Sequence, residues 1–309
     1  MQTIILTGGT GLIGKALTQR LLKKGFRVIV FTRKLPAAPA TEGLQYALWN
    51  VKKKKIDIAA IQKADHIIHL AGAGVVDKRW TASYKKEIQE SRTQSSALLI
   101  EALQQNENKV QTIVSASAIG WYGADTEQSL QKGFTETAPP DNNFLGETCR
   151  LWEESVDAAV ALGKRVVKLR TGIVLSNKGG ALAEFKKPLK YGLATILGSG
   201  RQTVSWIHID DLCRIFVEAI QNTNLHGVYN AVAPAPVSNK TFTLTLAKIV
   251  RKKFFIPVYV PSIVLKIMLG ESSIEVLKSS TVSCEKIKQA GFPFLYPSLE
   301  AALMQLCKG

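Results

Sequence analysis

Two hydrophobic patterns alternate along the first part of the chain. Short runs of apolar and β-branched residues, of the kind that buried parallel strands show, occur at 3–6, 27–32, 44–49, 65–72, 111–115 and 165–169. Apolar residues at helical spacing occupy the intervals at 12–24, 56–61, 83–104 and 143–162. Strand and helix alternate in this way for about 170 residues, which predicts an α/β fold with a Rossmann-type, doubly wound parallel sheet.

The pattern becomes less regular beyond residue 170. Helices are expected at 181–191, 210–221 and 239–253, and short strands at 205–209 and 227–232. Asn239 is a candidate N-cap for the last of these helices. We therefore predict a Rossmann domain over residues 1–170, to which 205–232 return, and a smaller mixed α/β C-terminal lobe over 171–309 that would hold the substrate.

A glycine-rich segment, T-G-G-T-G-L-I-G at residues 7–14, separates the first predicted strand from the first helix. Gly8 would permit a tight turn, Gly11 would let the backbone approach a pyrophosphate, and Gly14 would let helix and strand pack closely. The alternative is an ordinary strand-to-helix turn, but the correct flanks favour a dinucleotide fingerprint. The expected cofactor contacts from this segment are Gly8, Thr10, Gly11, Leu12, Ile13 and Gly14.

The end of the second strand indicates which dinucleotide is preferred. An NAD site would place Asp or Glu there for the ribose 2′-hydroxyl, whereas this chain has Thr32, Arg33 and Lys34. A guanidinium can bind a 2′-phosphate through two hydrogen bonds. The alternative is a solvated basic turn. The sequence therefore favours NADP(H) over NAD(H), with Thr32 and Arg33 as contacts.

Composition adds limits to this interpretation. The 309 residues are 46% hydrophobic and 21% charged, as in soluble globular proteins. No apolar run approaches the ~20 residues of a membrane span, and the first strand starts almost at Met1, so we expect no membrane partner and no signal peptide. The four cysteines are far apart, which predicts free thiols and no metal site in a cytoplasmic protein. A monomer or a homodimer is expected.

The net charge of +16 raises the question of nucleic-acid binding. The basic residues lie in short scattered clusters, and no aromatic residues interleave with them as a base-stacking surface would require. We therefore expect no nucleic-acid partner. The excess positive charge would still attract an anionic cofactor or substrate.

Several further motifs resemble those of a known family: H-L-A-G at 69–72, S-A-S-A-I-G-W-Y-G at 115–123, L-R-T-G-I-V-L at 169–175 and W-I-H-I-D-D-L at 206–212. Together with the glycine-rich segment they resemble the extended short-chain dehydrogenase/reductases. The block K-R-W-T-x-x-x-K-K-E-I-x-x-S-R at 78–92 and the tail at 260–271 and 290–303 resemble the atypical, nucleotide-sugar-epimerase-like branch of "epimerase family proteins". The likeness covers essentially the whole chain.

One departure from that family concerns its catalytic pair. Typical members carry Tyr-x-x-x-Lys, where the Tyr is a general acid/base and the Lys lowers its pKa. Counting back from Glu153 places Leu145 and Cys149 at these positions, and neither can do that chemistry. Ser117 resembles the upstream Ser of the family, and Tyr122 is the best remaining phenol. The alternatives are that Ser117 bonds backbone at a strand end and that Tyr122 is a packed aromatic.

The resemblance also implies further cofactor contacts. The strand that ends at Leu70, Ala71 and Gly72 would border the ligand, as strand ends do in a doubly wound sheet. Arg92 would touch phosphate or ribose and Glu87 ribose, the alternative being an exposed, ion-paired helix face. Val174 resembles the backbone position that lines the nicotinamide.

Two residues of the C-terminal half remain. His208 could act as a base near neutral pH, but we interpret it as structural, with Asp210 or Asp211 capping the following helix. Arg201, between glycines on a loop, is the candidate for binding an anionic substrate.

Two functions stay open on the sequence. The first is an NADP(H)-dependent oxidoreductase or epimerase acting on an unknown anionic small molecule, with Ser117 and Tyr122 replacing the missing pair. The second is a non-catalytic NADP(H)-binding redox sensor or scaffold. The absence of the family's Tyr and Lys at positions 145 and 149 favours this function.

Overall fold

The computed structural model describes residues 1–37, 41–252 and 254–308. An eight-stranded sheet forms its centre, and every neighbouring pair is parallel except β3 with β4. In spatial order the strands are β12 (Gly227–Ala231), β7 (Arg165–Thr171), β6 (Thr112–Ala118), β5 (His66–His69), β1 (Thr3–Thr7), β2 (Arg27–Thr32), β3 (Leu44–Asn50) and β4 (Lys55–Ile56). This confirms the predicted Rossmann-type α/β fold.

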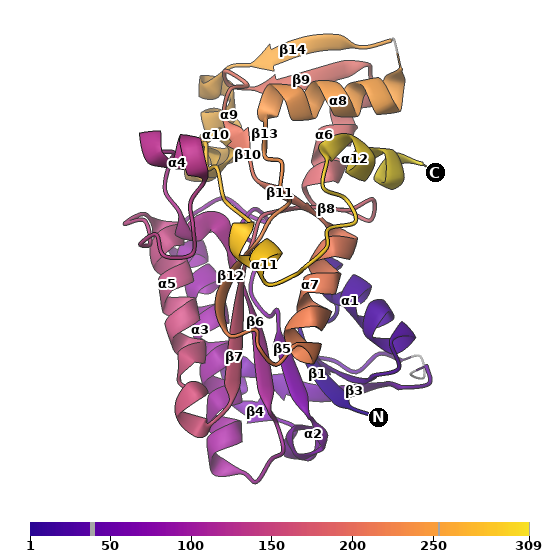
Figure 1. Ribbon diagram of the computed structural model, residues 1–309. Helices are drawn as coiled ribbons and strands as arrows, with labels where there is room; N and C mark the ends of the chain where they lie inside the picture. Colours follow the sequence, from indigo (N-terminus) through magenta and orange to yellow (C-terminus); the bar gives the residue numbers. More distant parts are fainter. Residues whose placement is uncertain (38–40, 253, 309) are drawn as a thin grey trace.

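Helices cover both faces of this sheet because its strands are apolar on both sides. Figure 1 shows α3 (Ala82–Gln105) and α5 (Phe144–Asp157) on one face and α1 (Leu12–Lys23) and α7 (Ile209–Gln221) on the other. The alternation of β1 divides the core: Ile4 and Leu6 pack with α1 and α7, and Ile5 packs with α2 (Ile58–Lys63), α3 and α5. The short helices η1 (Val51–Lys53), η2 (Ile119–Trp121) and η3 (Val160–Leu162) lie in the connections.

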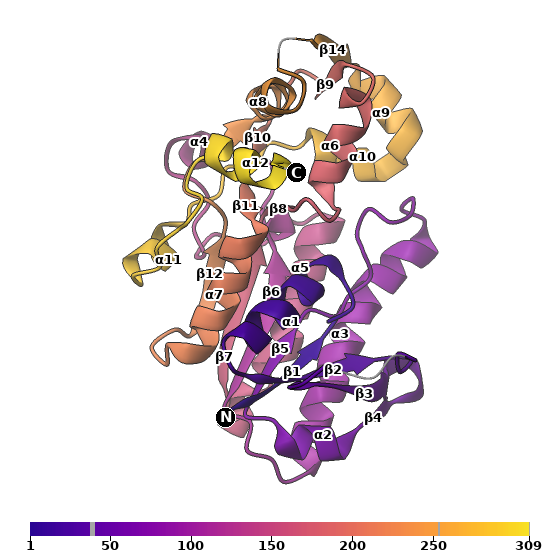
Figure 2. The same cartoon turned by 90° about the vertical axis from the view of Figure 1, so that its right-hand side faces the viewer.

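The C-terminal part adds three small two-stranded sheets. They pair β8 (Ile173–Leu175) with β11 (Trp206–His208), β9 (Leu193–Leu197) with β14 (Ile256–Val260), and β10 (Thr203–Val204) with β13 (Val237–Ser238). Its helices are α6 (Ala181–Leu189), α8 (Asn239–Arg251), α9 (Ser262–Leu269), η4 (Gly270–Ser272), α10 (Ser273–Leu277), α11 (Glu285–Gln289) and α12 (Leu299–Cys307). Figure 2 shows most of these elements above the large sheet.

The chain crosses between the two parts more than once. The strand β12 joins the large sheet beside β7, whereas β11 pairs with β8 outside it. In the other direction, the segment around α4 (Glu127–Lys132) bonds to the late chain: the Asp125 carboxylate accepts hydrogen bonds from Ser279 and Thr281. The sequence did not indicate this second crossing.

One expected helix cap is wrong. The Oγ of Ser238, not Asn239, accepts the hydrogen bond from the Thr241 N–H at the start of α8. The Asn239 side chain instead accepts a hydrogen bond from the Leu197 N–H at 2.9 Å and so joins α8 to β9. The expected helix end at Lys253 lies outside the described residues. Among those residues, no helix is long and apolar enough to cross a membrane.

Candidate functional site

The glycine-rich loop turns sharply from β1 into α1. Gly8 has φ +67°, and a Cβ there would lie 2.9 Å from the carbonyl carbon of Leu70. A Cβ on Gly14 would lie 2.3 Å from the Gly8 carbonyl oxygen. Gly11 occupies the N-cap position of α1, so no side chain bonds the free N–H groups of the first turn there. The first turn also contains no acidic residue. The loop therefore leaves backbone N–H groups at the positive end of α1 open to an anion.

A buried hydrogen-bond network fixes the end of β5 beside this loop. Thr7 Oγ1 accepts hydrogen bonds from the Leu70 and Ala71 N–H groups and lies 2.8 Å from His69 Nδ1. His69 Nε2 lies 3.2 to 3.3 Å from the hydroxyls of Ser96 and Ser95 on α3. Because Thr7 accepts two N–H groups, we assign its own proton to His69 Nδ1. The network holds residues 70–72 against the loop.

His69 is neutral in this network. Complete burial, and secondly the Arg92 guanidinium, lowers its pKa to about 3. A histidine with that pKa is a positioning residue rather than a base near neutral pH. The sequence contained both partners, Thr7 at one strand end and His69 at the next, but gave no sign of their contact.

The helix α3 contributes Arg92 to the same region. A Cβ on Gly72 would lie 3.1 Å from the Arg92 Cζ, so this backbone lies directly against the guanidinium. The guanidinium also donates to the Ile88 carbonyl and lies 4.9 Å from the Trp152 ring centre. Glu87, in contrast, is exposed and 3.6 Å from the Lys78 ammonium. The structure thus brings Arg92, but not Glu87, to the strand end.

The residues expected to select the cofactor lie at the neighbouring strand end. Thr32 Oγ1 donates a hydrogen bond to the Lys34 carbonyl at 2.9 Å, which tightens the turn after β2. The Arg33 side chain is exposed. Because β1, β2 and β5 are parallel neighbours, this turn shares the carboxyl edge of the sheet with the glycine-rich loop and residues 70–72.

Positions 145 and 149 of α5 are filled by packed apolar groups. Leu145 and Cys149 are both buried, and Leu145 lies against Gly120. The Cys149 thiol faces the Ala118 carbonyl at 3.7 Å, and burial raises its pKa to about 12. A thiol with that pKa is protonated at neutral pH, so it supplies neither a base nor a cation.

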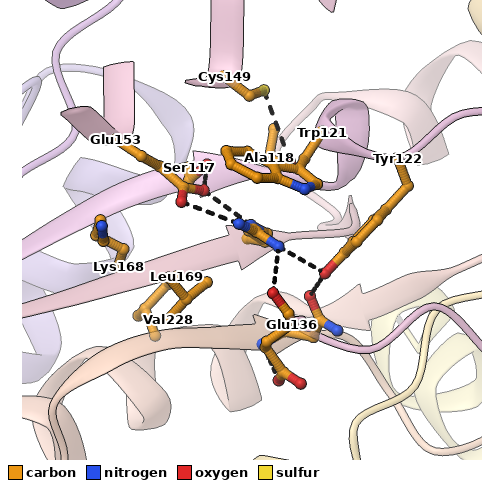
Figure 3. A network of polar contacts seen from close by, with 12 residues as sticks. Ser117, Ala118, Trp121, Tyr122, Glu136, Cys149, Glu153, Lys168, Leu169 and Val228 are labelled. Carbon is orange, nitrogen blue, oxygen red and sulfur yellow. Dashed lines mark hydrogen bonds and ion pairs between the residues drawn. The ribbon is translucent and has the colours of Figure 1, made fainter. Parts of the chain in front are cut away.

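Ser117 and Tyr122 belong to a second buried network, shown in Figure 3. Ser117 Oγ donates to Glu153 Oε1 at 2.7 Å, and Arg170 donates to both Glu153 oxygens at 2.8 and 3.1 Å. Arg170 also donates to Tyr122 Oη, which in turn donates to Asn230 Oδ1 at 2.7 Å. These contacts join β6, α5, β7 and β12.

This network differs from the expectation that both hydroxyls would be free to reach a substrate. Tyr122 is completely buried and stacks on Phe134, with ring centres 5.1 Å apart, and burial raises its pKa to about 12. The alternative interpretation of Tyr122, a packed aromatic side chain, describes its position in the structure. Ser117 is 3% exposed and bonds a carboxylate rather than the backbone. Neither hydroxyl faces solvent.

His208 has a structural position, but the expected cap is wrong. His208 itself is the N-cap of α7, where its Nδ1 accepts the Asp210 N–H at 3.0 Å. Its Nε2 lies 2.9 Å from Gln305 Oε1, and its ring stacks on Tyr296. Asp211 is fully buried and accepts the N–H groups of residues 295 and 296. It joins α7 to the C-terminal segment instead of capping the helix.

The remaining predicted residues lie on the C-terminal part. Val174 is in β8, opposite Ile207 of β11, and a Cβ on the nearby Gly180 would lie 3.0 Å from Leu12 of the glycine-rich loop. Arg201 is exposed in the turn between β9 and β10, next to the start of α8. The structure does not bring Arg201 into contact with the other predicted residues that it describes.

Contacts between the segment that leads into α3, together with its first turn, and the helices α9 and η4 connect the two parts of the molecule. Arg79 donates to the carbonyls of Ile267 and Met268, and Lys85 pairs with Glu271. Within the described ranges, no three His, Cys, Asp or Glu side chains gather so that they could hold a metal ion. The four cysteines are free thiols, as expected.

Comparison with known proteins establishes the family. The model of the NAD dependent epimerase/dehydratase family matches residues 4–231. The chain belongs to this family. A domain of unknown function, DUF1731, matches residues 260–306. Epimerase family protein SSP1921 from Staphylococcus saprophyticus is 37% identical over 309 residues, with 99% of each chain covered. These matches confirm the resemblance to epimerase family proteins.

Two solved structures have a similar fold. The crystal structure of human epimerase family protein SDR39U1 (isoform 2) with NADPH is similar over 99% of both chains, with a TM-score of 0.85 and 29% identity. UDP-glucuronic acid 4-epimerase from Bacillus cereus, solved with UDP-glucuronic acid and NAD, has a TM-score of 0.80 and covers 99% of this chain and 98% of its own. At 20% identity it shows a shared fold alone.

Proposed function

We propose that this epimerase family member binds NADP(H) at the carboxyl edge of its large sheet. The observation that carries the proposal is the cradle between β1 and α1, where Gly8, Gly11 and Gly14 keep backbone N–H groups open at the start of a helix. A Cβ at Gly8 or Gly14 would collide with the neighbouring backbone. The relation to a human protein solved with NADPH supports the same cofactor.

The chain offers a residue for each part of the cofactor. Residues 8–14 would hold the pyrophosphate, Thr32 and Arg33 the 2′-phosphate, and Leu70 to Gly72 with Arg92 the adjoining ribose and phosphate. Val174 would border the nicotinamide. Glu87 would reach a ribose only by leaving its ion pair with Lys78. When bound, NADP(H) supplies a hydride donor or acceptor.

The proposed reaction is that of an oxidoreductase or epimerase on an anionic small molecule. The net charge of +16 and the exposed Arg201 favour an anionic substrate. Ser117 and Tyr122 hold β6 and β12 through Glu153, Arg170 and Asn230.

A second candidate is a non-catalytic NADP(H)-binding sensor or scaffold. The burial of Ser117 and Tyr122, together with the apolar packing of Leu145, favours this function, because no described hydroxyl of this set is free for proton transfer. Turnover distinguishes the candidates. We would incubate the protein with NADPH or NADP⁺ and a set of sugar nucleotides, ketones and quinones. Net oxidation of NADPH, or conversion of a sugar nucleotide into its epimer without net change of the cofactor, supports the enzyme. Neither change with any compound supports the sensor.

Replacement of Arg33 by Asp tests the cofactor proposal itself. The variant loses a charge-assisted contact to the 2′-phosphate, so NADPH binding is expected to weaken by about 1.5–3 kcal/mol while NADH binding is unchanged. Titration calorimetry with both dinucleotides measures this. Lys24→Asp, an exposed change at the end of α1, is the control for net charge. Equal affinity of the parent protein for NADPH and NADH would contradict the proposal.

A further inference from the structure

Large exposed hydrophobic side chains concentrate in one short stretch of the C-terminal part. Ten of the twenty-one found in the described residues lie between 250 and 274, a span that contains β14 and α9. Phe254 is 81% exposed, and Ile263 and Ile267 of α9 are 65% and 69% exposed. Large exposed apolar patches are uncommon on monomeric soluble proteins, and they mark interaction sites.

The register of β9 with β14 places part of this surface on one side. Ile256 and Val258 stand opposite Leu193 and Thr195, so these residues share one face of the two-stranded sheet. The other face contains Ala194, which is fully buried on the side of α8. Figure 2 shows α8 on one side of β9 and β14 and α9 on the other. We use the name apolar face for these exposed sheet residues together with the exposed residues of the helix α9 that follows β14 in the chain: Leu193, Ile256, Val258, Ile263, Ile267 and Met268.

The charged residues of the two sequence segments that carry the apolar face all have one sign. Residues 237–270 contain six Lys or Arg residues, and residues 185–209 contain four. Neither segment contains an Asp or a Glu. Lys190, Arg251, Lys252 and Lys266 are exposed. None of these four makes an ion pair with another side chain of the described ranges. The acids just beyond, Glu271 and Glu275, already pair with Lys85 and Lys278.

We propose that the apolar face, with its basic rim, binds the surface of an anionic lipid bilayer. An apolar face rimmed by Lys and Arg is the pattern of segments that lie in the headgroup region, and each basic residue near an anionic surface adds to the attraction. A second copy fits less well, because a two-fold interface would bring the basic residues of both copies together without acidic residues of the apolar face to pair them. The helix α9 has eight residues and lies on the membrane rather than across it.

This inference differs from the expectation of no membrane partner, which rested on the lack of a spanning segment. Apolar burial and electrostatic attraction at a surface need no such segment. The proposal is also independent of cofactor binding, because the apolar face lies on β9, β14 and α9 and the glycine-rich loop lies between β1 and α1.

Vesicle flotation tests the proposal. The full chain is expected to float with vesicles that contain about a third phosphatidylglycerol in phosphatidylcholine, and to stay unbound with phosphatidylcholine alone. Lys266→Glu and Ile267→Ser should each weaken the binding by roughly fivefold or more. Lys52→Glu and Leu130→Ser, which alter an exposed lysine and an exposed leucine elsewhere, are the matched controls and should bind as the parent does. Unfolding curves verify that each variant is folded.

Three outcomes would overturn the proposal. The first is no flotation of the folded parent with anionic vesicles. The second is an equal loss in the control variants, which would indicate attraction by net charge without a specific face. The third is a dimeric parent, measured by light scattering, that Ile267→Ser converts to a monomer, because the apolar face would then be an interface between two copies.

Discussion

The three glycines of the loop after β1 have different physical roles. Gly8 needs a left-handed backbone with φ +67°, which side chains rarely adopt. Gly14 has no room for a side chain, because a Cβ would meet the Gly8 oxygen at 2.3 Å and the Gly9 Cα at 2.5 Å. Gly11 has φ −75°, and its Cβ would meet only the Gly8 oxygen, at 3.3 Å. A side chain at Gly11 is therefore compatible with folding but not with a ligand at the loop.

Two substitutions separate these roles. Gly11→Val is expected to leave a folded protein that no longer binds NADPH, since the branched side chain occupies the pyrophosphate position. Gly14→Ala is expected to lower the free energy of unfolding by about 1–3 kcal/mol or more, because two rigid backbone segments must move. Urea unfolding and the thermal shift produced by NADPH measure both effects. If NADPH still stabilised Gly11→Val, the proposed cofactor position would be wrong.

The helix α5 shows how an element can keep its place while its chemistry changes. Its inner side packs Leu145 on Gly120 and Cys149 near Arg92, at the positions where typical family members are expected to carry Tyr and Lys. Its outer side carries Arg150 between Glu147 and Glu154. The helix therefore packs a buried, uncharged side chain at position 149.

Restoring the family pair should destabilise this protein. In Leu145→Tyr/Cys149→Lys the new ammonium is buried beside Arg92, and the nearby Glu153 is already paired with Arg170, so the free energy of unfolding is expected to fall by about 3–5 kcal/mol. The larger Tyr adds strain against Gly120. Glu154→Gln, on the exposed side of the same helix, is the control and should change stability by less than about 0.5 kcal/mol. A double variant as stable as the parent would contradict the observed packing. Urea unfolding decides the matter.

The elements were more predictable than the contacts between them. The pattern predicted a helix at 83–104 that the structure places at Ala82–Gln105, because apolar spacing is a local property. The cap of α8 was missed because Ser238 and Asn239 are both good N-caps and sequence alone does not choose between them. The bond from Ser117 to Glu153 joins residues 36 positions apart. No periodicity reports such a contact, so the bond of Ser117 to a carboxylate could not be foreseen, whereas the packing of Tyr122 was one of the two alternatives that the sequence left open.

At the scale of the whole molecule, buried histidines couple folding to pH. Burial lowers the pKa of His66, His69 and His208, so the folded state disfavours their protonation. For His69 the pKa falls from 6.5 to about 3. A group with a lowered folded pKa stabilises the protein fully above its unfolded pKa, and this stability is lost as the pH falls between 6.5 and about 3.

Protonation of His69 in the unfolded chain should by itself lower the free energy of unfolding by about 1.4 kcal/mol for each pH unit between 6.5 and about 3. His69→Gln should be less stable near pH 7, because it loses part of the bonding to Thr7 and Ser96, but its stability should depend less on pH. Urea unfolding at a series of pH values measures the slope. His226→Gln, at an exposed position, should keep the parent slope; an unchanged slope in His69→Gln would contradict the assignment.

The position of β12 has a consequence for how the protein is made. The outer edge of β7 pairs with β12. The first residue of β12, Gly227, lies opposite Val167 and is translated about 60 residues after it. A ribosome-bound chain therefore presents an open sheet edge while the intervening part emerges, and open edges recruit other strands. Folding from the N-terminus onward must pause with this edge unpaired, and a fragment cut at residue 170 would keep it permanently.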